Sequence, residues 1–216
     1  MKQYSSFLRA YLSFQNFRYR LQNRRYLYLN ADNPHLLIHC PKSGGTSISR
    51  ALGLVGPGHF SLLEQLKSRP FPPRHIVMCL RDPLDRMIST YKYAQKPLHR
   101  RMHASLHLVG RYASFDDFVA SPTFDEFVRH HYFFRPIAEM ALGIKDVEIP
   151  VIYLDFRNIV LEAQSKLGID LGIFNTSPDV SSTRASYNED TLRKIVRIYS
   201  EDYEFIDHAL NQSSPK

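Results

Sequence analysis

His39-Cys40-Pro41-Lys42-Ser43-Gly44-Gly45-Thr46-Ser47 is a glycine-containing motif on which the expected fold of this chain depends. A short apolar run, residues 36–38, precedes it, and a run compatible with a helix, residues 47–54, follows it. A strand, a glycine turn and a helix in this order direct backbone N–H groups and a helix N-terminus toward an anion. The paired glycines allow a sharp bend and a close approach to a phosphate. The stretch therefore predicts an anion site, against the alternative of an ordinary strand-to-helix turn with a Ser or Thr cap.

A second stretch of similar layout follows the apolar run 75–80. Asp82-Pro83 is a helix-start signal, an N-cap followed by proline at the first helical position. Arg81 is then expected at the carboxyl end of a buried strand, and Ser89 two turns into the next helix. Arginine suits a phosphate because its planar fork can donate two hydrogen bonds at once. A surface arginine and an exposed helix serine are the plain alternative.

Together these stretches resemble the cofactor motifs of sulfotransferases that use 3′-phosphoadenosine 5′-phosphosulfate (PAPS). Residues 41–46 fit the family's loop, Pro-Lys-[Ser/Thr]-Gly-[Gly/Ser/Thr]-Thr, and residues 81–89 fit its Arg-[Asp/Asn]-Pro-x-x-Arg-x-x-Ser pattern. The triphosphate loop G-x-x-x-x-G-K-[ST] differs, because its lysine follows the glycines whereas Lys42 precedes them. The resemblance implies that Arg81 and Ser89 bind the 3′-phosphate. It also implies a set of ligands for the 5′-phosphosulfate: Lys42, Ser43, Gly44, Gly45, Thr46 and Ser47.

The resemblance implies direct in-line transfer, with Lys42 stabilising the oxygen that departs, and such a transfer needs a base for the acceptor hydroxyl. His59 is predicted to be this base, because residues 48–58 contain no carboxylate. Residues 58–63 also resemble the catalytic-histidine segment of uronyl 2-O-sulfotransferases, which act on glycosaminoglycans. That segment has a second histidine where this chain has Pro57. A capping or hydrogen-bonded structural histidine is the alternative for His59.

Strands expected at 36–38, 75–80 and 148–154 alternate with helices. This alternation predicts an α/β fold, a P-loop-like parallel sheet flanked by helices on both faces, with its ligand site at the carboxyl ends of the strands. Further helices are expected from 114, over 123–142 with a kink or break at Pro136, over 155–168 and over 188–206. The polar segment 175–187 resembles the family's loop over the nucleotide, and Arg184 is its candidate second ligand of the 3′-phosphate.

The first 30 residues differ from the remainder, so the chain divides into a basic aromatic arm, 1–30, and a sulfotransferase domain, 31–216. The arm holds six basic residues, eight aromatic residues and no acidic one. Phe7, Tyr11, Phe14 and Leu21 fall on one face of a helix. A helix packed on the domain, a helix for a membrane surface or acidic partner, and a transit peptide all remain open. No apolar run approaches the ~20 residues of a membrane span.

The net charge of +7 suits an anionic partner without choosing among nucleotide, nucleic acid, acidic glycan and membrane surface. Residues 95–111 are basic, and His99, His103 and His107 have the spacing of one helical face. No acidic or sulfur-bearing side chain joins them, so no metal is expected. The expected acceptor is a carbohydrate or small molecule with a free hydroxyl, an acidic glycan being one class, and no nucleic-acid partner is expected.

Two cysteines, Cys40 and Cys79, are predicted to be buried free thiols, which favours a reducing compartment and a cytoplasmic location. Two other classes of function stay open. A phosphotransferase would need Mg²⁺ and a triphosphate, and the position of the loop lysine argues against it. A non-catalytic module for acidic partners explains the charge but leaves the spacing of Arg81 and Ser89 unexplained. The sequence identifies neither the acceptor nor the oligomeric state.

Overall fold

The computed structural model describes residues 2–56, 59–171 and 186–212. Three strands, β1 (His35–Ile38), β2 (His75–Leu80) and β3 (Val151–Asp155), form a parallel sheet in the order β1-β2-β3. Leu36 lies beside Ile76, and Leu80 lies beside Asp155. The three predicted strands are confirmed, and their carboxyl ends meet at one edge of the sheet. β3 begins later than predicted, because Pro150 has no N–H group to donate to a neighbouring strand.

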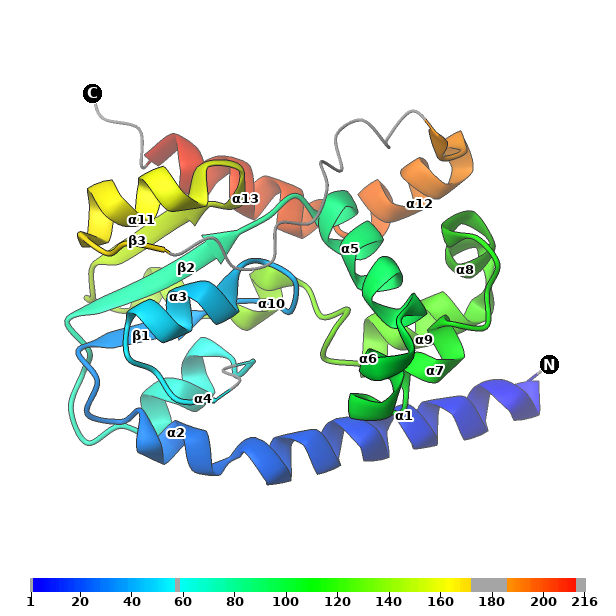
Figure 1. Ribbon diagram of the computed structural model, residues 1–216, viewed down its shortest axis with the longest axis horizontal. Coiled ribbons are helices and arrows are strands. Elements are labelled where there is room, and N and C mark those ends of the chain that lie inside the picture. The colour runs from blue at the N-terminus through cyan, green and yellow to red at the C-terminus, as the bar shows by residue number, and fades with distance from the viewer. Residues whose placement is uncertain (1, 57–58, 172–185, 213–216) are drawn as a thin grey trace.

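The described part of the chain also contains thirteen α-helices and two short 3₁₀ helices, some packed on the sheet and others grouped beside it (Figure 1). They are α1 (Lys2–Asn23), α2 (Arg25–Leu29), α3 (Gly45–Ala51), α4 (Leu62–Lys67), α5 (Pro83–Gln95), α6 (Pro97–Met102), α7 (Leu106–Val109), α8 (Phe115–Ala120), α9 (Pro122–His130), α10 (Ile137–Met140), η1 (Ile144–Asp146), η2 (Phe156–Asn158), α11 (Ile159–Leu167), α12 (Glu189–Ile198) and α13 (Ser200–Gln212).

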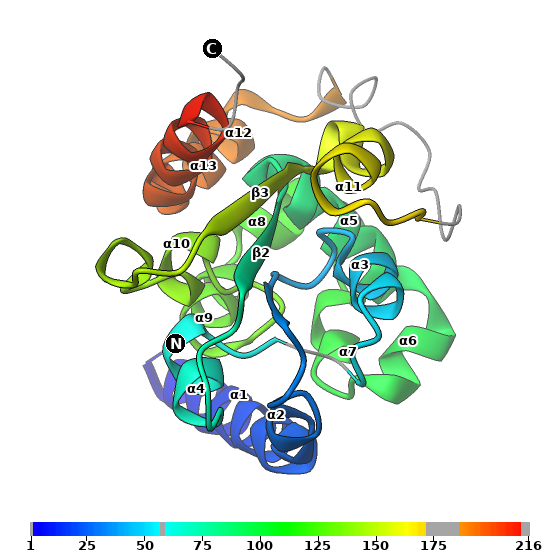
Figure 2. The ribbon, with the colours of Figure 1, turned by 90° about the vertical axis from the view of Figure 1, so that its left-hand side faces the viewer.

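Helices cover both faces of the sheet, so successive residues of β1 and β2 are buried on opposite faces (Figure 2). Leu36 and Ile38 point to one face and share a buried cluster with residues of α4, α10 and α13. Leu37 points to the other face and packs with Ile48 of α3 and Ala163 of α11. The predicted α/β class is therefore confirmed for a small, open, three-stranded sheet.

A second body of helices lies beside the sheet and has its own buried cluster (Figure 1). Rings of Phe118, Phe124 and Phe127 meet edge to face at its centre. Leu8 and Leu12 of α1 are buried in the same cluster, and Arg9 reaches Glu126 of α9 at 3.1 Å. The inner face of α1 therefore belongs to the packed body of the protein. No helix within the described ranges is long and apolar enough to cross a membrane.

Arg86, inside the second cofactor motif, is buried where α5 meets the C-terminal helices. Its Nη2 atom lies 3.7 Å from Oδ2 of Asp202, and its Nη1 donates to the carbonyl oxygen of Phe133 at 3.2 Å. The guanidinium also lies over the ring of Tyr199, 5.3 Å from the ring centroid. This part of the motif therefore holds the fold together.

Two helix predictions were wrong in extent. The segment 123–142 is two helices, and the break predicted at Pro136 is present, but α9 already ends at His130 and α10 begins only after Pro136. The segment 188–206 divides at Tyr199, whose buried hydroxyl donates to the carbonyl oxygen of Phe134 at 2.7 Å. The chain bends at Tyr199 so that α12 packs on the helical body and α13 on the sheet.

Candidate functional site

The loop after β1 turns sharply into α3 at two glycines that other side chains enclose. Gly44 has a φ of 80°, and a Cβ built on it would lie 2.6 Å from Cδ1 of Ile159. A Cβ on Gly45 would lie 2.0 Å from Nδ1 of His39. Neither position tolerates a larger residue without movement of a neighbour. The glycines therefore allow the loop to pack against η2, α11 and the histidine that precedes it.

Lys42 lies in the same loop and has a φ of 70°, the one positive φ of a non-glycine residue in the described ranges. A left-handed backbone is costly for a residue with a Cβ, so the surrounding structure must hold it. Its Nζ lies 4.6 Å from the centroid of the Tyr93 ring. Burial, then Arg81 and Lys96, lowers the pKa of Lys42 to about 8. This side chain is a cation that a bound anion would stabilise.

Arg81, at the end of β2, supports the loop directly. Its Nη1 donates to the carbonyl oxygen of Lys42 at 2.6 Å, and its guanidinium lies over the Phe156 ring at 4.2 Å from the centroid. The Nε atom is buried and has no hydrogen-bond partner within the described ranges. Burial lowers the pKa of Arg81. A buried donor without a partner is costly, and an acceptor such as a phosphate oxygen would satisfy it.

The thiol of Cys79 in β2 donates to the carbonyl oxygen of Ser43, which ties the same loop to the sheet. Both cysteines are free and buried, as predicted. Burial raises the pKa of Cys79, so this thiol is a structural donor.

The remaining predicted ligands differ in how accessible they are. Thr46 is exposed and Ser47 is partly buried on the first turn of α3. Ser43 and Ser89 are buried, and the N–H of Ser43 donates to the carbonyl oxygen of Cys40 at 3.3 Å. The Ser43 amide is thus used inside the loop in this structure, and its role as a phosphosulfate ligand stays a prediction. Arg184 lies outside the described residues.

His59 lies against the start of the loop, next to His39. The two ring centroids are 4.6 Å apart, and Nδ1 of His59 is 3.5 Å from the carbonyl oxygen of His39. A carbonyl can only accept, so this nitrogen carries the hydrogen and Nε2 keeps the lone pair. Burial, followed by the neighbouring His39, lowers the pKa of His59 well below 6.5. His59 is therefore neutral at neutral pH, the state that a base requires.

Aromatic rings from distant segments surround His59. Tyr19 of α1 stacks on Tyr132 with centroids 3.8 Å apart, and both rings lie about 6 Å from the ring of His59. The hydroxyl of Tyr132 contacts Nδ1 of His103 at 2.8 Å. No pattern in the sequence places Tyr19 or Tyr132 beside His59, because only the fold brings α1 and the segment after α9 together.

The predicted common face of three histidines is wrong, because the chain between residues 97 and 109 forms two short helices, α6 and α7. His99 stacks on Tyr93, with centroids 3.6 Å apart, and His107 is exposed. Within the described ranges no group of three or more His, Cys, Asp or Glu side chains could hold a metal ion. The expectation that no metal takes part stays a prediction.

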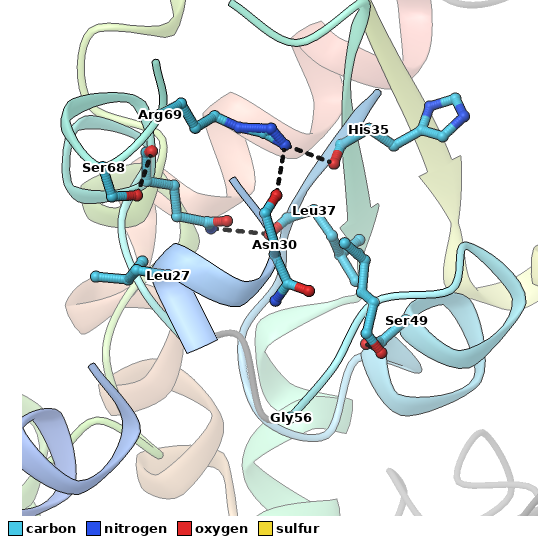
Figure 3. A pocket seen from close by; sticks show the side chains of 10 residues that line it. Leu27, Asn30, His35, Leu37, Ser49, Gly56, Ser68 and Arg69 are labelled. Carbon is cyan, nitrogen blue, oxygen red and sulfur yellow. Dashed lines mark hydrogen bonds between the residues drawn. The ribbon is translucent and has the colours of Figure 1, made fainter. Parts of the chain in front are cut away.

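A small cavity beneath α2 is separate from the strand ends (Figure 3). Its volume of about 20 Å³ has room for about one water molecule. Arg69, on its wall, donates to the backbone carbonyl oxygens of Asn30, Asn33 and His35. These bonds fasten the end of α2 to the start of β1, and the cavity belongs to that structural contact.

Gly45→Ala is expected to destabilise the protein by about 1–3 kcal/mol, since the new methyl group would overlap the ring of His39. Thermal or urea unfolding measures the effect. Gly53→Ala is the control, because a Cβ there meets no atom within 4 Å and only its left-handed backbone is strained. In a His39→Ala background, Gly45→Ala should cost much less. An equal cost in both backgrounds would contradict the overlap.

A scan of protein-family models, a search of curated proteins and a search of solved structures each find no match to this chain.

Proposed function

We propose that this chain is a PAPS-dependent sulfotransferase with a P-loop-like nucleotide site at the carboxyl edge of its sheet. The single observation that carries the proposal is the contact between Arg81 and the loop that contains Lys42. The side chain of Arg81, from the second motif, donates there to the backbone carbonyl oxygen of Lys42, from the first motif, at 2.6 Å. The buried Nε of Arg81 lacks a partner within the described ranges. Such a cationic, partly desolvated site fits a nucleotide with phosphates at both ends.

Each residue has a distinct proposed role. Arg81 and Ser89 bind the 3′-phosphate, while Lys42, Thr46, Ser47 and the amides at Gly44 and Gly45 hold the phosphosulfate. When bound, PAPS supplies the sulfuryl group and a phosphate leaving group. Lys42 neutralises negative charge on the departing oxygen, and His59 takes the acceptor's proton at Nε2. Ser89 must become accessible for this role, since it is 4% exposed in this structure.

The proposed acceptor is a hydroxyl-bearing carbohydrate or small molecule. Tyr19, Tyr132 and His103 lie around His59, and aromatic rings suit a ring-shaped acceptor. Tyr132 is 8% exposed and stacks on Tyr19, so an acceptor that packs on its ring requires this stack to open. Lys96 contributes to the lowered pKa of Lys42, so the basic segment 95–111 begins close to the loop. An acidic glycan would complement that charge.

The proposal is tested by nucleotide binding in the absence of Mg²⁺. Adenosine 3′,5′-bisphosphate should bind, and adenosine 5′-phosphate should bind at least ~30-fold more weakly in isothermal titration calorimetry. Arg81→Ala should weaken the bisphosphate by roughly 2 kcal/mol, the cost of removing a charge-assisted pair. Arg74→Ala is the matched control, because it removes an exposed arginine at the opposite end of β2.

Three other results would contradict the proposal. Equal affinity for the two nucleotides would contradict the proposed binding of the 3′-phosphate by Arg81 and Ser89. Tight binding of ATP that depends on Mg²⁺ would favour a phosphotransferase. Binding of neither nucleotide by folded protein would favour a non-catalytic module.

A further inference from the structure

Helix α1 is apolar on two nearly opposite faces, and the protein covers only one of them. At 100° per residue, Leu8 and Leu12 fall on the face that packs into the helical body. Phe7, Phe14 and Leu21 fall on the other side and are 77%, 56% and 61% exposed. Phe17 and, on α2, Tyr28 and Leu29 continue this exposed set. We call these six residues the outer stripe: Phe7, Phe14, Phe17, Leu21, Tyr28 and Leu29.

The outer stripe lies along one edge of the molecule. Both ribbon views show α1 and α2 on the outside, with the remaining helices on one side of them (Figures 1 and 2). Large apolar side chains that gather on an exposed face usually mark a surface for a partner or a membrane. Isolated exposed apolar residues would need no such explanation.

The charge beside the outer stripe is positive. Arg18, Arg24 and Arg25 are exposed, and residues 1–31 contain no acidic residue. Among the described residues, the side chains of Arg24 and Arg25 donate hydrogen bonds to the hydroxyls of Tyr28 and Tyr26 and pair with no carboxylate. Arg9 and Arg20, by contrast, pair with Glu126 and Glu64 on the inner side. The outer face thus has cations available for an anionic partner.

We infer that the outer stripe binds the surface of a membrane that contains anionic lipids. Exposed aromatic and leucine side chains beside arginines are the composition of a helix that lies in the interface plane, with its apolar face below the headgroups. A second copy of this chain fits less well. Pairing two outer stripes would bring Arg18, Arg24 and Arg25 of both copies together with no acidic residue of 1–31 to neutralise them. This inference does not rest on the proposed sulfotransferase activity.

The experiment is sedimentation of the full chain with vesicles. Wild-type protein should sediment with phosphatidylcholine vesicles that contain phosphatidylglycerol, and much less with phosphatidylcholine alone. The double variant Phe14→Ser, Phe17→Ser should reduce the affinity at least ~10-fold, because two apolar anchors are lost. A triple variant, Arg18→Gln, Arg24→Gln, Arg25→Gln, should reduce it similarly and remove most of its dependence on salt.

The matched control is Leu161→Ser, Val196→Ser, which removes two exposed apolar side chains from α11 and α12. It should sediment as the wild type does. Circular dichroism and urea unfolding verify that each variant is folded. Absence of sedimentation, or equal sedimentation of the Phe14→Ser, Phe17→Ser variant, would overturn the inference. Dimerisation abolished by that variant, without vesicle binding, would show that a second copy covers the stripe.

Discussion

Asp202→Ala is expected to lower the free energy of unfolding by about 3–5 kcal/mol, because it leaves the charge of Arg86 buried and unpaired. Both residues are 1% exposed, and their charged groups lie 3.7 Å apart. The substitution also removes the acceptor for the N–H of Ala138, which donates to Oδ1 of Asp202 at 3.0 Å. Urea unfolding followed by circular dichroism measures the loss.

The matched control is Asp207→Ala, which removes an exposed carboxylate from the same helix α13. Its effect should stay within about 0.5 kcal/mol. The double variant Arg86→Met, Asp202→Leu replaces the pair with apolar groups and should recover more than half of the lost stability. A loss below about 1 kcal/mol in Asp202→Ala would mean that Arg86 does not depend on this carboxylate.

The strands were predictable because each is a short apolar run that ends at a turn signal. The capped helix after Arg81 was also predictable from the sequence. In the structure the side chain of Asp82 accepts from the N–H of Asp85 at 3.0 Å, and Pro83 is the first helical residue. The lengths of the helices after residue 122 could not be predicted from the sequence, because the bends after His130 and at Tyr199 depend on contacts between distant segments. Such tertiary contacts leave no local pattern.

The orientation of α1 could not be predicted for a similar reason. Both of its faces carry apolar residues, so periodicity alone does not decide which face packs inward. Leu8 and Leu12 are buried because α1 packs against α9, where the carboxylate of Glu126 accepts hydrogen bonds from the side chain of Arg9. Of the face that the sequence singled out, Phe7, Phe14 and Leu21 are exposed, whereas Tyr11 is partly buried against the helical cluster.

The part of the candidate site that depends on parallel-sheet geometry could be predicted from the sequence. Lys42 and Arg81 follow adjacent parallel strands, so their meeting at one edge was expected from the sequence. His39 was not identified, although it belongs to the first motif, because its ring becomes important only through its contacts with Gly45 and His59. Phe156, under the guanidinium of Arg81, was missed for the same reason.

His59→Gln and His59→Ala should each lower turnover by ~10²–10⁴-fold while leaving PAPS affinity within a few-fold, because a base touches the acceptor's proton and not the nucleotide. Glutamine retains a donor for the carbonyl oxygen of His39, so it separates loss of the base from loss of structure. Turnover is measured on an acceptor found by screening hydroxyl compounds with labelled PAPS. His107→Ala, an exposed histidine of the basic segment, is the control and should leave turnover unchanged.

The dependence of kcat/KM on pH provides the second readout of the same prediction. Protonated His59 cannot accept a proton, so the rate should fall as pH decreases through the pKa of this group. Burial and His39 lower that pKa well below 6.5, which places the fall on the acid side of 6.5. The fall should disappear in His59→Gln, whose side chain does not titrate.

Glu64 is a poor substitute base, because Oε2 accepts from the amide and hydroxyl of Ser61 at 3.0 and 2.8 Å and Oε1 pairs with Arg20. If His59→Gln keeps both its rate and its acid limb, the base is another group, and His103, which contacts Tyr132 beside His59, becomes the first histidine to replace.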